Sequence, residues 1–144
     1  MVAKNITIAI GNQKGGVGKT TSTACIGAAL ALRGKRVLLV DLDAQQNLTF
    51  TLTQNEDPET SIYDTLVKDQ PLPIVPIREN LDLVPASLDL ARAEIDMATM
   101  MAREGILKSC LDEHKEKYDY ILMDCSPSLG IVTTNALVAA DKLY

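Results

Sequence analysis

The sequence has few cysteines, few aromatic residues and a single histidine, and these shortages limit its chemistry. Its 144 residues include three cysteines, four tyrosines, one phenylalanine and no tryptophan. Cys25, Cys110 and Cys125 are widely spaced and form no Cys-x-x-Cys pair, and His114 cannot complete a Cys/His metal set. We therefore expect free thiols in a reducing compartment rather than a metal site, a redox pair or a disulfide framework.

Long hydrophobic runs and a targeting segment are also missing. No apolar run reaches the roughly 18 residues that a membrane span requires. The N-terminal run at residues 6–10 is too short for a signal peptide, and no small-residue cleavage site follows it. The sequence therefore predicts a cytoplasmic protein without a membrane segment.

Basic residues are outnumbered by acidic ones. The 14 Lys and Arg residues against 19 Asp and Glu give a formal net charge of -5. This balance argues against a whole-chain basic surface that holds nucleic acid through counterion release, but not against a local basic patch. With 47% hydrophobic and 23% charged residues, the composition is globular, and the length fits one domain over residues 1–144.

Short apolar runs alternate with longer helical patterns along the chain. We expect strands at residues 6–10, 37–40, 81–84 and 120–123, and helices at residues 18–33, 61–68 and 129–140. Residues 87–116 have a helical pattern interrupted near Gly105, which predicts two helices. Three prolines between residues 71 and 76 predict a loop or an edge strand. This order predicts an α/β fold with a mostly parallel β-sheet and helices on both faces, in three layers.

The last four residues, 141–144, have the pattern of a further strand that has only begun. We therefore expect a sheet that is incomplete at its C-terminal end. The chain is then the N-terminal portion of a longer protein.

A glycine-rich segment between the first strand and the first helix carries the strongest functional signal. It runs from Gly11 to Thr21 as GNQKGGVGKTT, with Gln13 where the strict P-loop pattern has glycine. Its glycines let backbone N–H groups point at phosphate, and the helix N-terminus adds its positive dipole end. We expect Lys19 to reach the β- and γ-phosphates, Thr20 to bind Mg²⁺ and Thr21 to approach the α-phosphate. A dinucleotide site is disfavoured because G-x-G-x-x-G is absent.

Three aspartates follow apolar runs. Asp124 ends the run at residues 120–123, the place of a Walker B aspartate that holds Mg²⁺. Asp41 and Asp43 follow the run at residues 37–40. Because ligands of open α/β sheets bind at the carboxyl ends of strands, we expect the three aspartates to gather there beside the P-loop.

Together these segments resemble the ParA/Soj partition ATPases, P-loop NTPases with a deviant Walker A box. The box at residues 14–21 has the extra lysine of that group at Lys14, residues 40–47 resemble its second box, and residues 124–130 resemble its Walker B and switch II segment. Further matching stretches lie at residues 61–64, 83–87 with 93–95, and 135–141. The sequence departs from the family pattern at Ala44, Gln46 and Ser126.

The resemblance implies a function and assigns roles to residues. It implies a protein that binds ATP and Mg²⁺, dimerises face to face and hydrolyses ATP in chromosome or plasmid segregation. ATP contacts are expected from Lys14, Gly15, Gly16, Val17, Gly18, Lys19, Thr20 and Thr21, and metal contacts from Thr20, Asp43 and Asp124. Asp43 would orient or activate the attacking water, and Lys14 would reach across the dimer to the partner subunit's phosphates.

The resemblance also implies partners and a location. The expected partners are a second copy of the chain, a ParB-like protein and non-specific DNA, the DNA being bound through regions outside this chain. The location would be the nucleoid within the cytoplasm. Two alternatives stay open: a MinD-like division-site ATPase, and a nucleotide-binding fragment without turnover. A reductase of the nitrogenase iron-protein type is disfavoured, because the three cysteines do not suit a cluster.

Overall fold

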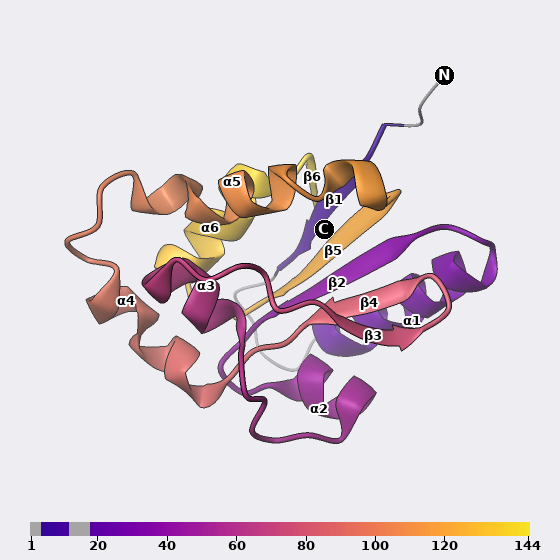
Figure 1. Ribbon diagram of the computed structural model, residues 1–144, viewed down its shortest axis with the longest axis horizontal. Helices are drawn as coiled ribbons and strands as arrows, with labels where there is room; N and C mark the ends of the chain where they lie inside the picture. Colours follow the sequence, from indigo (N-terminus) through magenta and orange to yellow (C-terminus); the bar gives the residue numbers. More distant parts are fainter. Residues whose placement is uncertain (1–3, 12–17) are drawn as a thin grey trace.

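The structure is a computed structural model that describes residues 4–11 and 18–144, and its centre is a mixed β-sheet (Figure 1). The strands are β1 (Ile6–Ile10), β2 (Val37–Leu42), β3 (Val75–Arg78), β4 (Leu81–Val84), β5 (Tyr120–Cys125) and β6 (Lys142–Leu143). Their order across the sheet is β3-β4-β2-β5-β1-β6. All pairings are parallel except that of β3 with β4. The sequence-based expectation of a mostly parallel sheet is confirmed.

The helices cover both faces of this sheet (Figure 1). Their bounds are α1 (Lys19–Leu32), α2 (Asn47–Thr53), α3 (Ile62–Lys68), α4 (Ala93–Asp96), α5 (Ile106–Asp112) and α6 (Ile131–Ala139). Alternate residues of β2 point to opposite faces, so Val37 and Leu39 pack with α1 and α2, whereas Leu38 and Val40 pack with the other helices. The three-layer expectation is therefore confirmed.

The edges of the sheet match two further expectations. The proline-rich stretch forms the edge strand β3, which contains Pro76 and runs antiparallel to β4. At the opposite edge, β6 pairs with β1 through Ile8 and Ala9, so residues 142–143 do form a strand. Proline is tolerated at an edge because one side of that strand donates no ladder hydrogen bond.

The segment at residues 87–116 differs from the two helices that its pattern predicts. It consists of the short helix α4, the helix α5 and three 3₁₀ turns at Leu88–Arg92, Arg103–Gly105 and Lys115–Lys117. The break is set by Ala102, whose φ of 50° is left-handed and cannot continue a helix. Beyond the break, the Asn135 side chain in α6 accepts a hydrogen bond from the Leu107 backbone N–H and fixes the start of α5.

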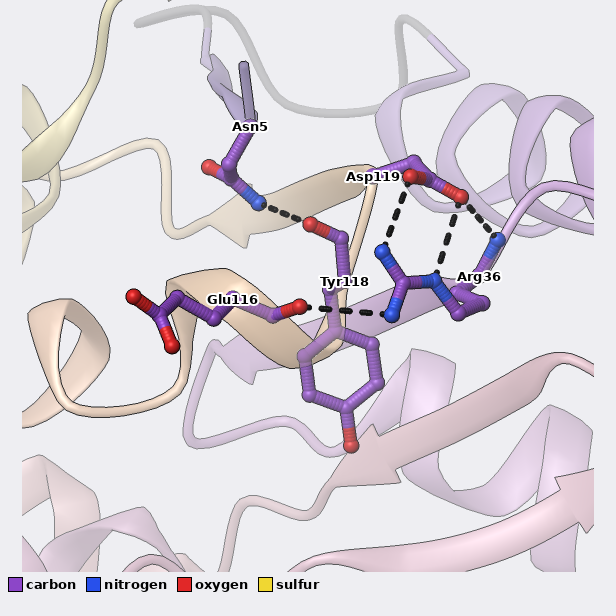
Figure 2. A network of polar contacts seen from close by, with 5 residues as sticks. All are labelled: Asn5, Arg36, Glu116, Tyr118 and Asp119. Carbon is purple, nitrogen blue, oxygen red and sulfur yellow. Dashed lines mark hydrogen bonds and ion pairs between the residues drawn. The ribbon is translucent and has the colours of Figure 1, made fainter. Parts of the chain in front are cut away.

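Polar side chains fasten together the amino ends of three neighbouring strands (Figure 2). Asn5, Arg36 and Asp119 come immediately before β1, β2 and β5, and we call this set the amino edge. The Asn5 amide donates to the Tyr118 carbonyl at 2.9 Å. The Asp119 carboxylate accepts from the Arg36 backbone N–H at 2.8 Å and from the Arg36 guanidinium at 3.1 Å. The polar side chains of the amino edge are therefore hydrogen-bonded within the chain.

Candidate nucleotide-binding site

The opposite edge of the sheet, where the parallel strands end, carries the predicted phosphate loop. β1 ends at Ile10, and α1 begins at Lys19 after Gly18, whose φ of 83° is left-handed and favours glycine. Gly18 supplies no side-chain cap to the first turn of α1, which leaves its backbone N–H groups for another acceptor. Lys14, Gly15, Gly16 and Val17 lie outside the described residues. Thr21 is exposed in the first turn of α1.

Thr20 and Asp124 meet at this edge although they are far apart in the sequence. The Thr20 hydroxyl donates to Asp124 Oδ2 at 2.7 Å. Asp124 is 1% exposed, and its Oδ1 has no hydrogen-bond partner among the described residues. Burial raises the pKa of Asp124, while the Thr20 hydrogen bond and the charge of Lys19 lower it. A buried carboxylate oxygen without a partner is the arrangement that a cation or its bound water would complete.

Asp43 lies near enough to Asp124 for its charge to act on that carboxyl. It follows the end of β2, is half-buried, and its negative charge raises the pKa of Asp124. Its own Oδ1 accepts from the Gln45 backbone N–H at 3.0 Å, and its backbone N–H donates to Asp41 Oδ1 at 3.1 Å. The structure therefore brings Lys19, Thr20, Asp43 and Asp124 together at one edge.

Asp41 lies beside Asp124 in the strand register, as the sequence predicts, but its side chain is used within the fold. Its Oδ2 accepts from the Thr49 backbone N–H at 2.9 Å and from the Thr49 hydroxyl at 2.7 Å, so it caps α2. Burial raises the pKa of Asp41 to about 6, against its ordinary value of 3.8. Asp41 thus supports α2 and the Asp43 backbone instead of contributing a free carboxylate.

Two residues that support this edge escape local sequence reasoning. Thr49 links Asp41 to the segment after β4, because the Thr49 hydroxyl also accepts a hydrogen bond from the Ala86 backbone N–H at 2.9 Å. Gln46, at a position where the family pattern has glycine, adopts a φ of 60°. Its buried amide donates to the carbonyls of Glu56 and Ala86. Gln46 therefore holds this loop in place through two hydrogen bonds. A polar residue in a turn does not by itself predict such a role from the sequence.

We call the set of Gly11, Asp41, Asp43 and Asp124, together with Lys19 and Thr20 beside them, the carboxyl edge. Among the residues that the structure describes, no group of three His, Cys, Asp or Glu side chains is placed to hold a metal by itself. The carboxyl edge instead offers one hydroxyl and one carboxylate oxygen to a cation. Mg²⁺ is commonly held by one or two carboxylates, substrate phosphates and water, so these residues fit Mg²⁺ bound with a nucleotide. Within residues 4–11 and 18–144, no helix is long and apolar enough to cross a membrane.

The mostly parallel sheet, the succession of β1 and α1 and the Thr20–Asp124 pair are features of the P-loop NTPase fold. A family model described as an AAA domain matches residues 5–144. The chain is 51% identical over 140 residues to the sporulation initiation inhibitor protein Soj of Bacillus subtilis, covering 94% of this chain and 55% of that protein. It is 44% identical over 142 residues to the chromosome-partitioning ATPase Soj of Treponema pallidum, covering 96% of this chain and 55% of that protein. The chain belongs to the ParA/Soj family of partition ATPases within this AAA-domain group.

Solved structures agree with this assignment. A plasmid partition protein from Borrelia burgdorferi aligns with a TM-score of 0.90 at 32% identity, over 97% of this chain and 64% of that one. A cobyrinic acid a,c-diamide synthase from Mycobacterium smegmatis with bound ATP analogue and magnesium aligns with a TM-score of 0.92 at 43% identity, over 96% of this chain and 58% of that one. The chain spans about half the length of the curated relatives it matches.

Proposed function

We propose that this protein binds Mg²⁺-ATP at the carboxyl edge and hydrolyses it. The observation that carries the proposal is the Thr20–Asp124 hydrogen bond of 2.7 Å beside the buried, unpartnered Asp124 Oδ1. A hydroxyl at the start of the P-loop helix and an aspartate at the end of the neighbouring strand are the two protein ligands that P-loop NTPases use for magnesium. Magnesium supplies charge neutralisation at the β- and γ-phosphates when it is bound.

The chain's own residues divide the remaining work. The Lys19 ammonium would bind phosphate oxygens as a point charge at the N-terminus of α1, whose first-turn N–H groups face the same anion. Asp43 would orient the attacking water, since it is half-buried and shares its space with Asp124. Lys14 would contact the phosphates of the partner subunit, by resemblance to the family.

The wider role proposed is DNA segregation. The relatives named above include a chromosome-partitioning ATPase and a plasmid partition protein. By likeness to them, the ATP-bound protein would form a face-to-face dimer and act on the nucleoid with non-specific DNA and a ParB-like protein. The DNA-binding surface is assigned to regions outside this chain.

The test is the rate of ATP hydrolysis by the natural full-length protein, measured alone, with duplex DNA, and with DNA and the ParB-like protein encoded next to it. The proposal expects slow basal hydrolysis that rises only when DNA and the protein partner are both present. Hydrolysis that neither addition changes would support the alternative of a nucleotide-binding protein without a segregation role.

A second candidate is ATP-dependent diamide formation from cobyrinic acid. It is favoured by the 43% identity to the Mycobacterium smegmatis structure that carries this name. Both candidates require Mg²⁺-ATP at the same edge, so the site does not separate them. ATP turnover that depends on cobyrinic acid and not on DNA would favour the second candidate over segregation.

A further inference from the structure

The N-terminus of α6 is capped by a residue from another part of the chain. Gly130 occupies the N-cap position and offers no side chain. Instead, Glu94 in α4 accepts a hydrogen bond on Oε2 from the Ile131 backbone N–H at 2.5 Å. A carboxylate at this place also suits the positive dipole end of a helix, and α6 is nine residues long. Glu94 belongs to a stretch that carries the family resemblance but has no role at the carboxyl edge.

The approach of Glu94 also explains the glycine at position 130. A Cβ atom added to Gly130 would lie 2.5 Å from Glu94 Oε2 and 3.2 Å from its carboxyl carbon. The backbone φ of Gly130 is -76°, so an alanine there is not strained by its own conformation. An alanine at 130 would therefore act mainly by displacing the Glu94 carboxylate. The hydrogen bond to Ile131 and the short distance to position 130 both indicate that the Glu94 carboxylate contacts the start of α6.

The helix α4, which carries Glu94, is anchored in the core. In α4, Ala93 on one side of it and Met97 just beyond the helix are fully buried in the core. Asp96 accepts a 2.6 Å hydrogen bond from the hydroxyl of Tyr63, which is buried in α3. Glu94 itself is exposed. The position of its carboxylate therefore depends on the placement of α4 and not on packing by neighbouring side chains.

The five residues 126–130 join this capped helix to the carboxyl edge. They follow Asp124 and Cys125 at the end of β5 and lead directly into α6. Four of them, all but Leu129, line a cavity of about 630 Å³ together with Asp43 and Glu94. The Ser128 carbonyl accepts from the Thr133 hydroxyl at 2.7 Å, which adds a second attachment to α6. The position of α6 therefore sets one wall of the cavity next to Asp43.

We propose that Glu94 is a positioning residue for ATP hydrolysis. By holding the Ile131 N–H, it fixes residues 126–130 at the distance from Asp43 that the hydrolytic step requires. The inference rests on the proposed function, because it concerns the rate of that step. It assigns no contact between Glu94 and the nucleotide, so binding of Mg²⁺-ATP is independent of it.

The test compares Glu94→Ala, Glu94→Gln, Gly130→Ala and the double variant Glu94→Ala/Gly130→Ala in the natural full-length protein. Three quantities are measured: kcat for ATP, the Kd for Mg²⁺-ATP, and the hydrogen-exchange rate of the Ile131 amide. Glu104→Ala is the matched control, since Glu104 is an exposed acid in the same segment. Loss of one charge-assisted hydrogen bond predicts a fall in kcat and a rise in Ile131 exchange of about tenfold for Glu94→Ala.

The other variants sharpen the assignment. Glutamine keeps an acceptor oxygen, so Glu94→Gln should retain at least about half of the wild-type kcat. Gly130→Ala should match Glu94→Ala, and the double variant should be no worse than either single change, because all three remove one contact. Kd should stay within about twofold throughout.

Two results would overturn the proposal: wild-type kcat and Ile131 exchange in Glu94→Ala, or a defect in Glu94→Gln equal to that of Glu94→Ala. A wild-type protein that hydrolyses no ATP would contradict the proposed function and, with it, the catalytic part of this inference. In that case the Ile131 exchange rates still decide whether Glu94 holds α6.

Discussion

The amino edge and the carboxyl edge of the same three strands use their polar residues in opposite ways. At the amino edge, the Arg36 hydrogen bond holds the pKa of Asp119 below its ordinary value (Figure 2). At the carboxyl edge, burial raises the pKa of both Asp41 and Asp124. One oxygen of Asp124 has no partner among the described residues. The amino edge is thus organised for stability, whereas the carboxyl edge keeps buried negative charge that a bound cation would relieve.

This contrast predicts that substitutions at the two edges separate function from stability. Changes at Lys19, Asp43 or Asp124 of the carboxyl edge should remove nucleotide chemistry with little loss of stability, whereas Asp41 contributes to the fold. Changes at the amino edge should lower the free energy of unfolding and leave nucleotide binding intact.

The largest effect is expected from Lys14 and Asp43. If Lys14 neutralises charge on the partner subunit's phosphates, as an arginine finger does, its loss should lower the hydrolysis rate by about 10³–10⁵. Lys14→Ala should still bind ATP through Lys19 but fail to form the ATP dimer. Asp43→Ala should bind ATP and accumulate as a dimer, because only hydrolysis is lost. Light scattering with ATP distinguishes the two variants, and equal dimerisation of both would refute a role of Lys14 across the interface.

The next effect concerns Lys19 at the start of α1. Because Lys19 would contact phosphate charge that is already present before reaction, Lys19→Ala should weaken Mg²⁺-ATP binding by at least about 100-fold. Titration calorimetry measures this loss. Lys35→Ala is the matched control, since Lys35 is exposed and lies beyond the other end of α1. Normal binding by Lys19→Ala would mean that the phosphate loop is wrongly assigned.

Asp41 predicts how stability changes with pH. Its pKa is raised from 3.8 to about 6 by burial, so the folded state favours the protonated carboxyl. The stability that this preference contributes is complete below about pH 4 and is lost as pH rises through about 6. Between pH 4 and 7, the free energy of unfolding should fall by about 2 kcal/mol more in the wild type than in Asp41→Asn.

Urea unfolding of both proteins at several pH values, without nucleotide, measures this difference. An identical pH dependence in the wild type and in Asp41→Asn would show that Asp41 titrates as an ordinary aspartate. That result would contradict the effect of burial on the pKa of Asp41.

The smallest effect is expected at the amino edge. Asp119→Ala removes the acceptor of the Arg36 backbone N–H and guanidinium, and should lower the free energy of unfolding by about 1 kcal/mol, because the pair is partly exposed. The Kd for Mg²⁺-ATP should be unchanged. Denaturant unfolding and calorimetry measure the two quantities. If Asp119→Ala lost nucleotide affinity without losing stability, the amino edge would take part in nucleotide binding and the two edges would not differ in role.

Local sequence patterns were sufficient to predict the strands, the start of the first helix near Gly18 and the place of Asp124. Apolar runs that end in glycine or aspartate identify parallel strands and their carboxyl ends directly. The same reasoning could not show that Thr49 satisfies the Asp41 carboxylate and accepts from Ala86, or that Glu94 caps α6. Those contacts join residues 8 to 37 positions apart, and they depend on how helices pack, which no local periodicity encodes.

Residues 87–116 show a further reason for the difference. Their apolar spacing is helical, but Met97 and Leu107 are fully buried while Met101 between them is 92% exposed. The chain breaks at Ala102, whose φ is 50°, and short helical pieces replace the two expected helices. Tertiary packing here overrides a helical propensity that the sequence does carry.

If the buried Asp124 carboxylate serves magnesium and not the fold, Asp124→Asn should separate the two. The measurement is the Kd for ATP with Mg²⁺ and with EDTA, together with the free energy of unfolding, with Asp119→Asn as the matched control. Mg²⁺ should strengthen ATP binding in the wild type and the control but not in Asp124→Asn, which should unfold at equal or higher denaturant concentration than the wild type. An Asp124→Asn protein that keeps the full Mg²⁺ dependence of ATP binding, or that loses it only because the fold is destabilised, would show that Asp124 has no such role.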